Sequence, residues 1–311
     1  MHPSLRAPWR AFRPMRQALA ALVWTLAAAL LAGWLWAAPA RAAGPEQVVG
    51  MVLDVQGSGE LKQGAETGKL QLLSYLKPGA QLRLDAGAHA SVSHYGARLI
   101  YKLSGPVLAQ VDADGIRVLK GAAAVTKSLA EKVALAALNP NMGAAAFKMR
   151  ALPPDVVLAA PSPKTVLLTR RPQFRWIAPE SVSYQFTLTE LPSRELARVR
   201  VDGAAWELPP GQQLAYDKDY SWTVSYTSAA DGRARSTSAE FRVAPQADAD
   251  ELLALRPDAG AGVDEWVQYA AILSEFRAFD DICQVKRKLA AQRPELAKTL
   301  GTVLMVQQRC D

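Results

Sequence analysis

The chain has 311 residues, half of them hydrophobic, with 36 lysines and arginines against 29 aspartates and glutamates. Its length allows two or three domains, and its apolar content excludes a disordered chain. Five basic residues and no acidic one lie in the first 42 residues, which leaves 31 basic against 29 acidic residues in the remainder. The overall positive charge therefore gives no support to nucleic-acid binding.

Residues 1–42 form a separate segment. Four arginines, the last of them Arg16, precede an apolar run over 18–38, and small residues stand one and three positions before Ala43. This pattern is typical of a secretory signal peptide that is cleaved before Ala43. The apolar run is also just long enough to span a bilayer, so an uncleaved N-terminal inner-membrane anchor is the alternative. Both interpretations predict that the rest of the chain is exported.

Residues 43–120 alternate apolar and polar positions in short runs. The first run, from Gly50 to Gly57, lacks the spacing of a helix and has glycines at both ends. Turn residues follow at 76–79, 104–106 and 112–115. Short alternating segments between such turns predict a β-sandwich or β-roll.

This region resembles the FecR-type β domain of bacterial envelope proteins. The matching positions are Gly50, Val52, Val55, Gly57, Leu76, Gly79, Leu82 and Val92. The resemblance covers about 70 of the 311 residues, and a generic β-roll is the alternative. It implies a periplasmic location and a part in envelope signalling or cell-wall binding. The family's sigma-factor regulators carry a cytoplasmic helical domain before the membrane span. Only about 17 residues precede the apolar run here, so that form of regulation is not expected.

Residues 121–160 are predicted to be a connector. The alanine-rich stretch 122–138 has apolar residues at four-residue spacing, which allows a short helix. The stretch 147–150 is compatible with a strand, and prolines around Pro161 mark the next boundary.

Residues 161–245 are predicted to be a second β-sandwich. Aromatic residues recur at every second position, which places each set on one buried face of a sheet. They are Phe174, Trp176, Tyr184, Phe186, Tyr220, Trp222 and Tyr226. The stretches 172–176 and 214–224 resemble a fibronectin type III-like domain. Trp206 lies in a short stretch beside turn residues, where its ring can be exposed, and is the candidate ligand-binding residue.

Residues 246–311 have the period of helices. One amphipathic face is formed by Trp266, Tyr269, Ala270, Leu273 and Phe276. Asp248 and Asp280 are predicted helix caps, and Pro294 is predicted in the first turn of the last helix. The region resembles one tetratricopeptide-type helix pair with an extra helix, which completes a mainly β fold with a small helical tail.

Two cysteines, Cys283 and Cys310, are the candidate disulfide of an exported chain. If the last two helices fold back near residue 293, Cys310 lies roughly 10 Å beyond the position facing Cys283. A bond then requires the last turn to unwind and fold back, or the helices to cross at an angle. Two unpaired thiols, one buried and one exposed, are the alternative.

No known catalytic motif is present, and the carboxylates are scattered. His89 and His94 are five residues apart on one predicted strand and are expected on opposite faces. We therefore expect no metal site, no cofactor and no catalytic residue. The sequence predicts a non-enzymatic exported protein that acts as a binding, scaffolding or signalling-accessory module in the envelope. Its partner would be an envelope protein held by sheet edges or by the helical tail. A peptidoglycan- or glycan-binding module is the alternative, and an unrecognised hydrolase is the third hypothesis.

Overall fold

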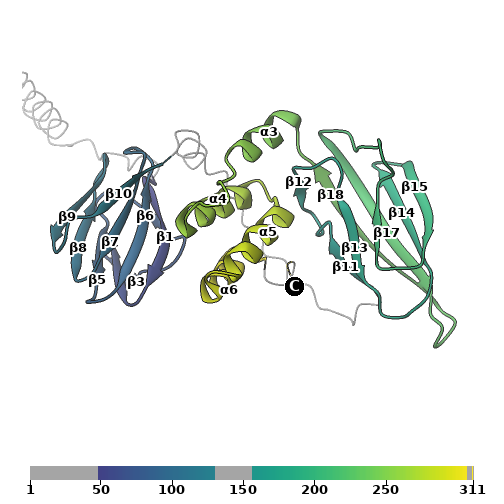
Figure 1. Ribbon diagram of the computed structural model, residues 1–311, viewed down its shortest axis with the longest axis horizontal. Coiled ribbons are helices and arrows are strands. Elements are labelled where there is room, and N and C mark those ends of the chain that lie inside the picture. The colour runs from purple at the N-terminus through teal and green to yellow at the C-terminus, as the bar shows by residue number, and fades with distance from the viewer. Residues whose placement is uncertain (1–47, 130–155, 307–309, 311) are drawn as a thin grey trace, which may run out of the picture. The chain divides into compact units, whose positions relative to one another are not determined.

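The computed structural model describes residues 48–129, 156–306 and 310 (Figure 1). These residues form four sheets and four C-terminal helices. The fold is thus mainly β with a short helical region, as the sequence predicts. No helix in this described part of the chain has the length and apolar character needed to span a bilayer.

The first β region consists of two five-stranded antiparallel sheets. Sheet A has the order β10-β7-β6-β1-β4, and sheet B has the order β3-β2-β5-β8-β9. The strands are β1 Gly50–Gln56, β2 Gly59–Gln63, β3 Glu66–Lys69, β4 Tyr75–Leu76, β5 Gln81–Leu84, β6 His89–His94, β7 Leu99–Ser104, β8 Val107–Val111, β9 Ile116–Lys120 and β10 Val125–Ser128. Alternate residues of both sheets share one apolar core, which includes Val52, Leu82, Val92 and Ala109.

Both faces of β1 are buried. Val52 belongs to the core between sheets A and B, whereas Met51 and Leu53 belong to a second core that the helices share. All three side chains are almost completely inaccessible to solvent. Three consecutive apolar residues are the pattern of a strand covered on both faces.

The second β region also pairs two sheets. Sheet C has the order β11-β13-β16, and sheet D has the order β12-β18-β17-β14-β15. The strands are β11 Val157–Ala160, β12 Val166–Leu167, β13 Gln173–Ile177, β14 Tyr184–Glu190, β15 Arg194–Val201, β16 Ala205–Glu207, β17 Lys218–Thr227 and β18 Ala234–Val243. β12 pairs with β18 in parallel, and the other pairs are antiparallel.

The predicted aromatic residues form the core of this region. Phe174 contacts the rings of Phe186 and Trp222 edge-on, with centroids 5.0 and 5.4 Å apart. Near the start of β17, the hydroxyl of Tyr220 accepts a hydrogen bond from the Ala215 N–H at 2.8 Å and donates to the Ala215 carbonyl at 3.3 Å. The ring is buried, so these bonds satisfy its only polar group.

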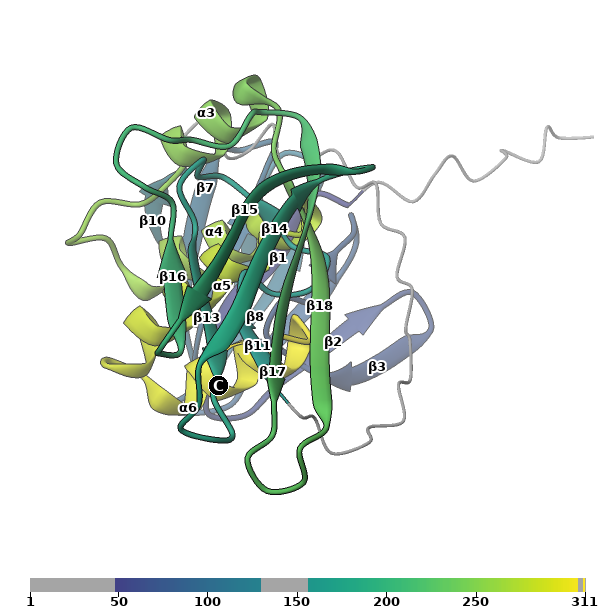
Figure 2. The ribbon, with the colours of Figure 1, turned by 90° about the vertical axis from the view of Figure 1, so that its right-hand side faces the viewer.

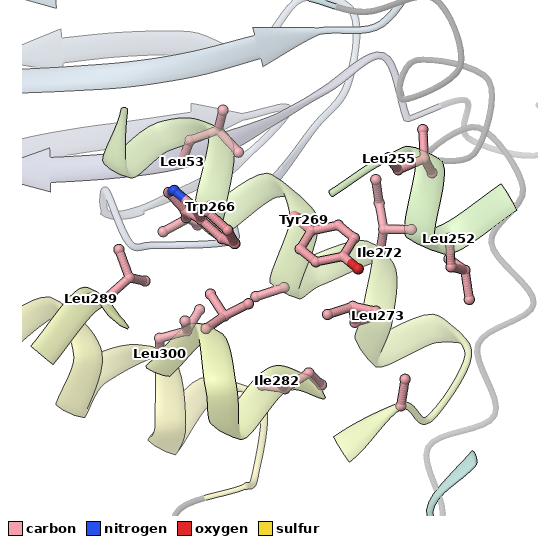
Figure 3. Close-up of a cluster of buried hydrophobic side chains, with 14 of the residues drawn as sticks. Leu53, Leu252, Leu255, Trp266, Tyr269, Ile272, Leu273, Ile282, Leu289 and Leu300 are labelled. Carbon is pink, nitrogen blue, oxygen red and sulfur yellow. The ribbon is translucent and has the colours of Figure 1, made fainter. Parts of the chain in front are cut away.

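The helices are α3 Gln246–Ala254, α4 Val263–Glu275, α5 Phe279–Ala290 and α6 Pro294–Val303. Their apolar faces meet in one core, where Trp266 and Tyr269 of α4 lie close to Ile282 of α5 and Leu300 of α6 (Figure 3). This core also includes Leu53 of β1, so the helices cover the outer face of sheet A.

Polar pairs border the contact between α4 and sheet A. Lys102 lies 3.4 Å from Asp264, and Lys127 lies 2.5 Å from Glu265. The Tyr75 hydroxyl donates to Oε1 of Glu275 at 3.2 Å. Burial and the neighbouring carboxylate raise the pKa of Tyr75 to about 12, so the phenol stays protonated and keeps this bond.

Several local predictions are wrong. The sequence allowed a short helix that included Val125 to Ser128, but these residues form β10, because pairing with β7 extends sheet A. Asp248 is not a cap: α3 begins two residues earlier, after Pro245, and Asp248 lies in its first turn. The remainder of the possible helix over 122–138, the possible strand over 147–150 and the signal segment lie outside the described residues.

Candidate functional site

Trp206, the predicted ligand-binding residue, lies on β16 opposite Phe174 of β13. Its ring stacks on Phe186 with centroids 4.4 Å apart and lies 5.6 Å from Phe174. The side chain is partly buried and packs against the aromatic core rather than standing free in a turn. Its binding role stays a prediction, and its visible contacts are those of a core residue.

The predicted disulfide is present between Cys283 of α5 and Cys310, with a Cα–Cα distance of 5.1 Å. α6 ends at Val303, and Met305 has a positive φ of 54°, so the chain leaves the helix direction there. The helix therefore stops short of Cys310, in agreement with one of the two arrangements that the sequence left open for this bond, an unwound last turn.

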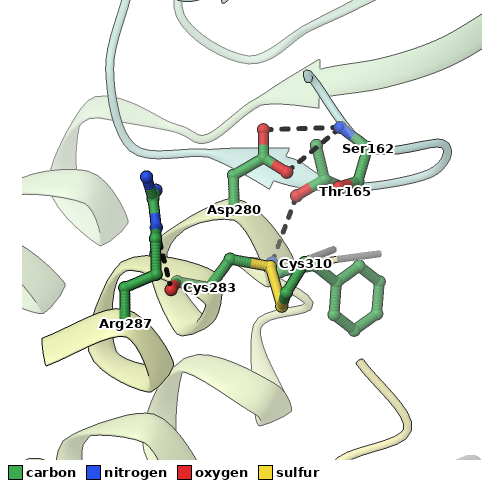
Figure 4. Close-up of a disulfide and its surroundings, with 7 residues drawn as sticks. Ser162, Thr165, Asp280, Cys283, Arg287 and Cys310 are labelled. Carbon is green, nitrogen blue, oxygen red and sulfur yellow. Dashed lines mark hydrogen bonds between the residues drawn. A yellow bond between two sulfur atoms is a disulfide. The ribbon is translucent and has the colours of Figure 1, made fainter. Parts of the chain in front are cut away.

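The disulfide lies near the junction between α5 and the segment before β12 (Figure 4). The Ser162 N–H donates to the carboxylate of Asp280 at 3.1 Å, and the Phe279 N–H donates to the Thr165 hydroxyl at 3.1 Å. Asp280 was predicted to cap α5, but Ala278 is the residue at the cap position. Asp280 instead lies in the first turn of the helix and accepts a hydrogen bond from a neighbouring segment.

The histidines do not form a metal site with each other. His89 is exposed and His94 is fully buried, in agreement with opposite faces of β6. The Ala97 N–H donates to Nδ1 of His94 at 3.0 Å, and Nε2 lies 3.0 Å from the Asp112 carbonyl. Nδ1 is therefore the ring nitrogen that accepts, and Nε2 is the one placed to donate to the carbonyl. Within the described residues, no three metal-ligating side chains gather in one place.

The most prominent interaction surface in the described structure is the free edge of sheet D. β15 is the last strand of this sheet and pairs only with β14 (Figure 2). It is eight residues long, whereas the other edge strands among the described residues have two to five. Natural sheets usually shorten or cover such edges, because the unpaired backbone groups bind other strands.

The register of sheet D places polar side chains in rows across its outer face. One row runs Arg200, Gln185, Ser225 and Ser236, and the next runs Arg198, Thr187, Thr223 and Ser238. Neighbouring strands lie about 4.8 Å apart, so each row is continuous. The opposite face of β15, with Val199 and Val201, packs against the aromatic core.

The edge carries a local positive charge. β15 contains three arginines and one glutamate. Arg198 binds Glu195 at 2.5 Å, and this ion pair lowers the pKa of the Glu195 carboxyl. Arg194 lies 3.8 Å from Glu190. Arg200 makes no ion pair with any described residue, so its guanidinium is available to a partner.

A bulge limits the usable length of the edge. The β14–β15 register shifts at Leu196, and regular pairing resumes from Ala197 to Val201. These five residues include Arg198 and Arg200 on the exposed face. The sequence predicts that sheet edges recruit partners but does not single out this strand. The signal was the alternation of arginine with valine over 198–201, which indicates a half-buried strand with a basic outer face.

No protein-family model matches this chain, and no curated protein matches it in sequence.

Proposed function

We propose that this protein is a non-enzymatic exported envelope protein that binds a protein partner through the edge of β15. The observation that carries the proposal is the long unpaired edge strand with Arg198 and Arg200 on its exposed face. An extended segment of the partner adds a strand to sheet D, and backbone hydrogen bonds supply much of its affinity.

The charge of the edge selects the kind of segment. An added strand places alternate side chains beside Arg198 and Arg200, so acidic residues at every second position would pair with both guanidinium groups. A second copy of β15 fits poorly, because antiparallel pairing would bring arginines of the two copies together. The proposed partner is therefore an extended acidic segment of another envelope protein.

The architecture supports a scaffolding role. We propose that 161–245 is a fibronectin type III-like domain. The three- and five-stranded sheets and the Tyr220 hydroxyl bound to the backbone upstream fit such a sandwich, whereas the parallel pair β12–β18 departs from its antiparallel pattern. A FecR-like identity for 43–120 and a periplasmic location remain proposals from the sequence. The disulfide favours an oxidising compartment.

The test compares the full-length protein with the double variant Arg198→Glu/Arg200→Glu. Both are used to capture partners from envelope extract, and peptidoglycan sacculi are assayed in parallel. Arg233→Glu is the matched control, because Arg233 is an exposed arginine in the β17–β18 turn of the same sheet.

We expect the wild-type protein and the control to recover the same partner and the double variant to lose it. Binding should weaken as salt is raised, because exposed charges are screened. Equal recovery by the double variant would overturn the β15 site. Retention on sacculi that is lost in Trp206→Ala would instead favour the glycan-binding alternative.

A further inference from the structure

A cavity of about 210 Å³ lies within the helical region, away from β15. Its walls include Arg256 after α3, Trp266 and Tyr269 of α4, and Asp281, Val285 and Lys288 of α5. Asp281 and Lys288 are seven residues apart on one helix, so their backbones lie about 10 Å apart along its axis. The cavity therefore has charged groups along its length and aromatic rings beside them.

Asp281 is a partly buried carboxylate that lines this cavity. It has no hydrogen bond or ion pair with the described residues, although its neighbour Asp280 binds the Ser162 N–H. Burial, and secondarily the charge of Asp280, raises the pKa of Asp281 to about 6. The Tyr269 hydroxyl also has a pKa raised to about 12, by burial and by Asp281. A cationic group placed beside Asp281 would favour the charged form of its carboxyl.

The positive groups are held apart from Asp281. The Lys288 ammonium lies 4.5 Å from the centroid of the Trp266 ring and donates to the Ala259 carbonyl at 3.2 Å. Its position is thus fixed at one end of the cavity. Arg256 is exposed at the rim, close enough to influence the charge of Asp281 but without an ion pair to it.

We propose that this cavity binds a small zwitterion, an α-amino acid, with its ammonium group at Asp281 and its carboxylate at Arg256. An amino acid carries one ammonium and one carboxylate, which are complementary in charge to the Asp281 carboxylate and the Arg256 guanidinium that line this cavity. The ligand side chain then lies along the apolar wall formed by Trp266 and Val285. Such a ligand would give both Asp281 and Arg256 an oppositely charged partner.

The volume agrees with this class of ligand. Sites for drug-sized ligands usually have about 300–1,000 Å³. The cavity, at about 210 Å³, is smaller and suits a small molecule such as a single amino acid.

The proposal is tested by calorimetric titration of the full-length protein with L-alanine and L-leucine. N-acetyl-L-alanine lacks the ammonium group and L-alaninamide lacks the carboxylate, so each removes one of the two contacts. Asp281→Asn and Arg256→Gln are the site variants. Asp258→Asn, an exposed aspartate in the loop that follows α3, is the matched control.

We expect saturable binding of at least one amino acid, with affinity at least ten-fold weaker in both site variants and unchanged in the control. Neither modified ligand should bind. Absence of saturable binding, equal binding by N-acetyl-L-alanine, or unchanged affinity in Asp281→Asn would overturn the proposal. Asp281→Asn removes a partly buried charge that has no ion pair among the described residues, so it is expected to fold, and thermal unfolding verifies this. The cavity shares no residue with β15, so its failure leaves the proposed function intact.

Discussion

Arg293, immediately before α6, places Nη1 3.3 Å from Oδ2 of Asp54 in β1, although 239 positions separate them in the chain. The side chain of Asp54 is only 12% exposed, and its Oδ2 also accepts a hydrogen bond from Gln56 at 3.0 Å. This ion pair lies beside the core that Leu53 shares with the helices. The last helices are therefore joined to β1 by packing and by charge.

Replacement of Arg293 by alanine should destabilise the protein. The change leaves a largely buried carboxylate without its cation, which costs about 1–3 kcal/mol in the free energy of unfolding. Urea unfolding measures this loss. Lys298→Ala on the exposed face of α6 is the control and should have little effect. The double variant Arg293→Ala/Asp54→Asn should lose less free energy of unfolding than the sum of the losses in the two single variants. Strictly additive losses would rule out the pairing.

Removal of the disulfide should destabilise the helical region. Cys283 and Cys310 are 27 positions apart, and closing a loop of this length stabilises a fold by about 3–4 kcal/mol in the chain-entropy account. Chemical unfolding with and without reductant measures the difference. The double variant Cys283→Ala/Cys310→Ala should lose all sensitivity to reductant. Labelling of thiols in the native wild-type protein would contradict the pairing.

Stability should depend on the ionisation of Asp281. Burial raises its pKa from the ordinary value of 3.8 to about 6, so the folded chain holds this proton more tightly than the unfolded chain. The contribution of this group to stability is therefore greatest below about pH 4 and is lost as the pH rises through about 6. At pH 7, Asp281→Asn should raise the free energy of unfolding by about 1–3 kcal/mol.

This difference is measured by unfolding at a series of pH values. The gain from Asp281→Asn should shrink as the pH falls below about 6, because the wild-type carboxyl becomes neutral there. A gain that is constant over this range would show that Asp281 titrates normally.

Loss of the Tyr220 hydroxyl should weaken the second sandwich. Tyr220→Phe leaves the Ala215 N–H and carbonyl without their side-chain partner, at a cost of about 1–2 kcal/mol. Tyr216→Phe is the matched control, since it keeps the ring that lies beneath Arg170. Thermal unfolding compares the two variants, and equal effects would assign no special role to the Tyr220 hydroxyl.

Trp206→Ala should cost stability even if it has no effect on binding. The ring stacks on Phe186 in the core, and truncation of a partly buried tryptophan is expected to cost about 2–3 kcal/mol. Chemical unfolding measures this cost. An unchanged free energy of unfolding would mean that the ring contributes little to packing and would revive its role as an exposed stacking platform.

The strands were predictable where apolar residues alternate, as in Tyr220, Trp222 and Val224, because one face of each strand is buried. The helix that contains Trp266 and Leu273 was predictable in the same way, because its apolar residues recur at the spacing of a helix and one face is buried. The burial of both faces of β1 was not recognised. Its signal was the consecutive apolar run at Met51, Val52 and Leu53, which has no polar side.

The candidate site was less predictable, because it depends on which strands lie at edges. The run at 198–201 resembles any half-buried strand, and only the sheet order places β15 last. The cavity near Asp281 combines residues of two helices, α4 and α5, and of the loop between α3 and α4, and their convergence is a tertiary property. Trp206 was expected to be exposed from its turn-rich surroundings, but pairing with β13 brings its ring onto the core.

The most direct test of the central claim is site-specific photo-cross-linking in living cells. A photoreactive amino acid replaces Arg200 on β15 in one strain and Arg233 in the β17–β18 turn in another. Partner binding at this edge predicts an adduct of defined mass with another envelope protein from position 200 and none from position 233. Adducts from neither position, or the same adducts from both, would contradict partner binding at the edge of β15.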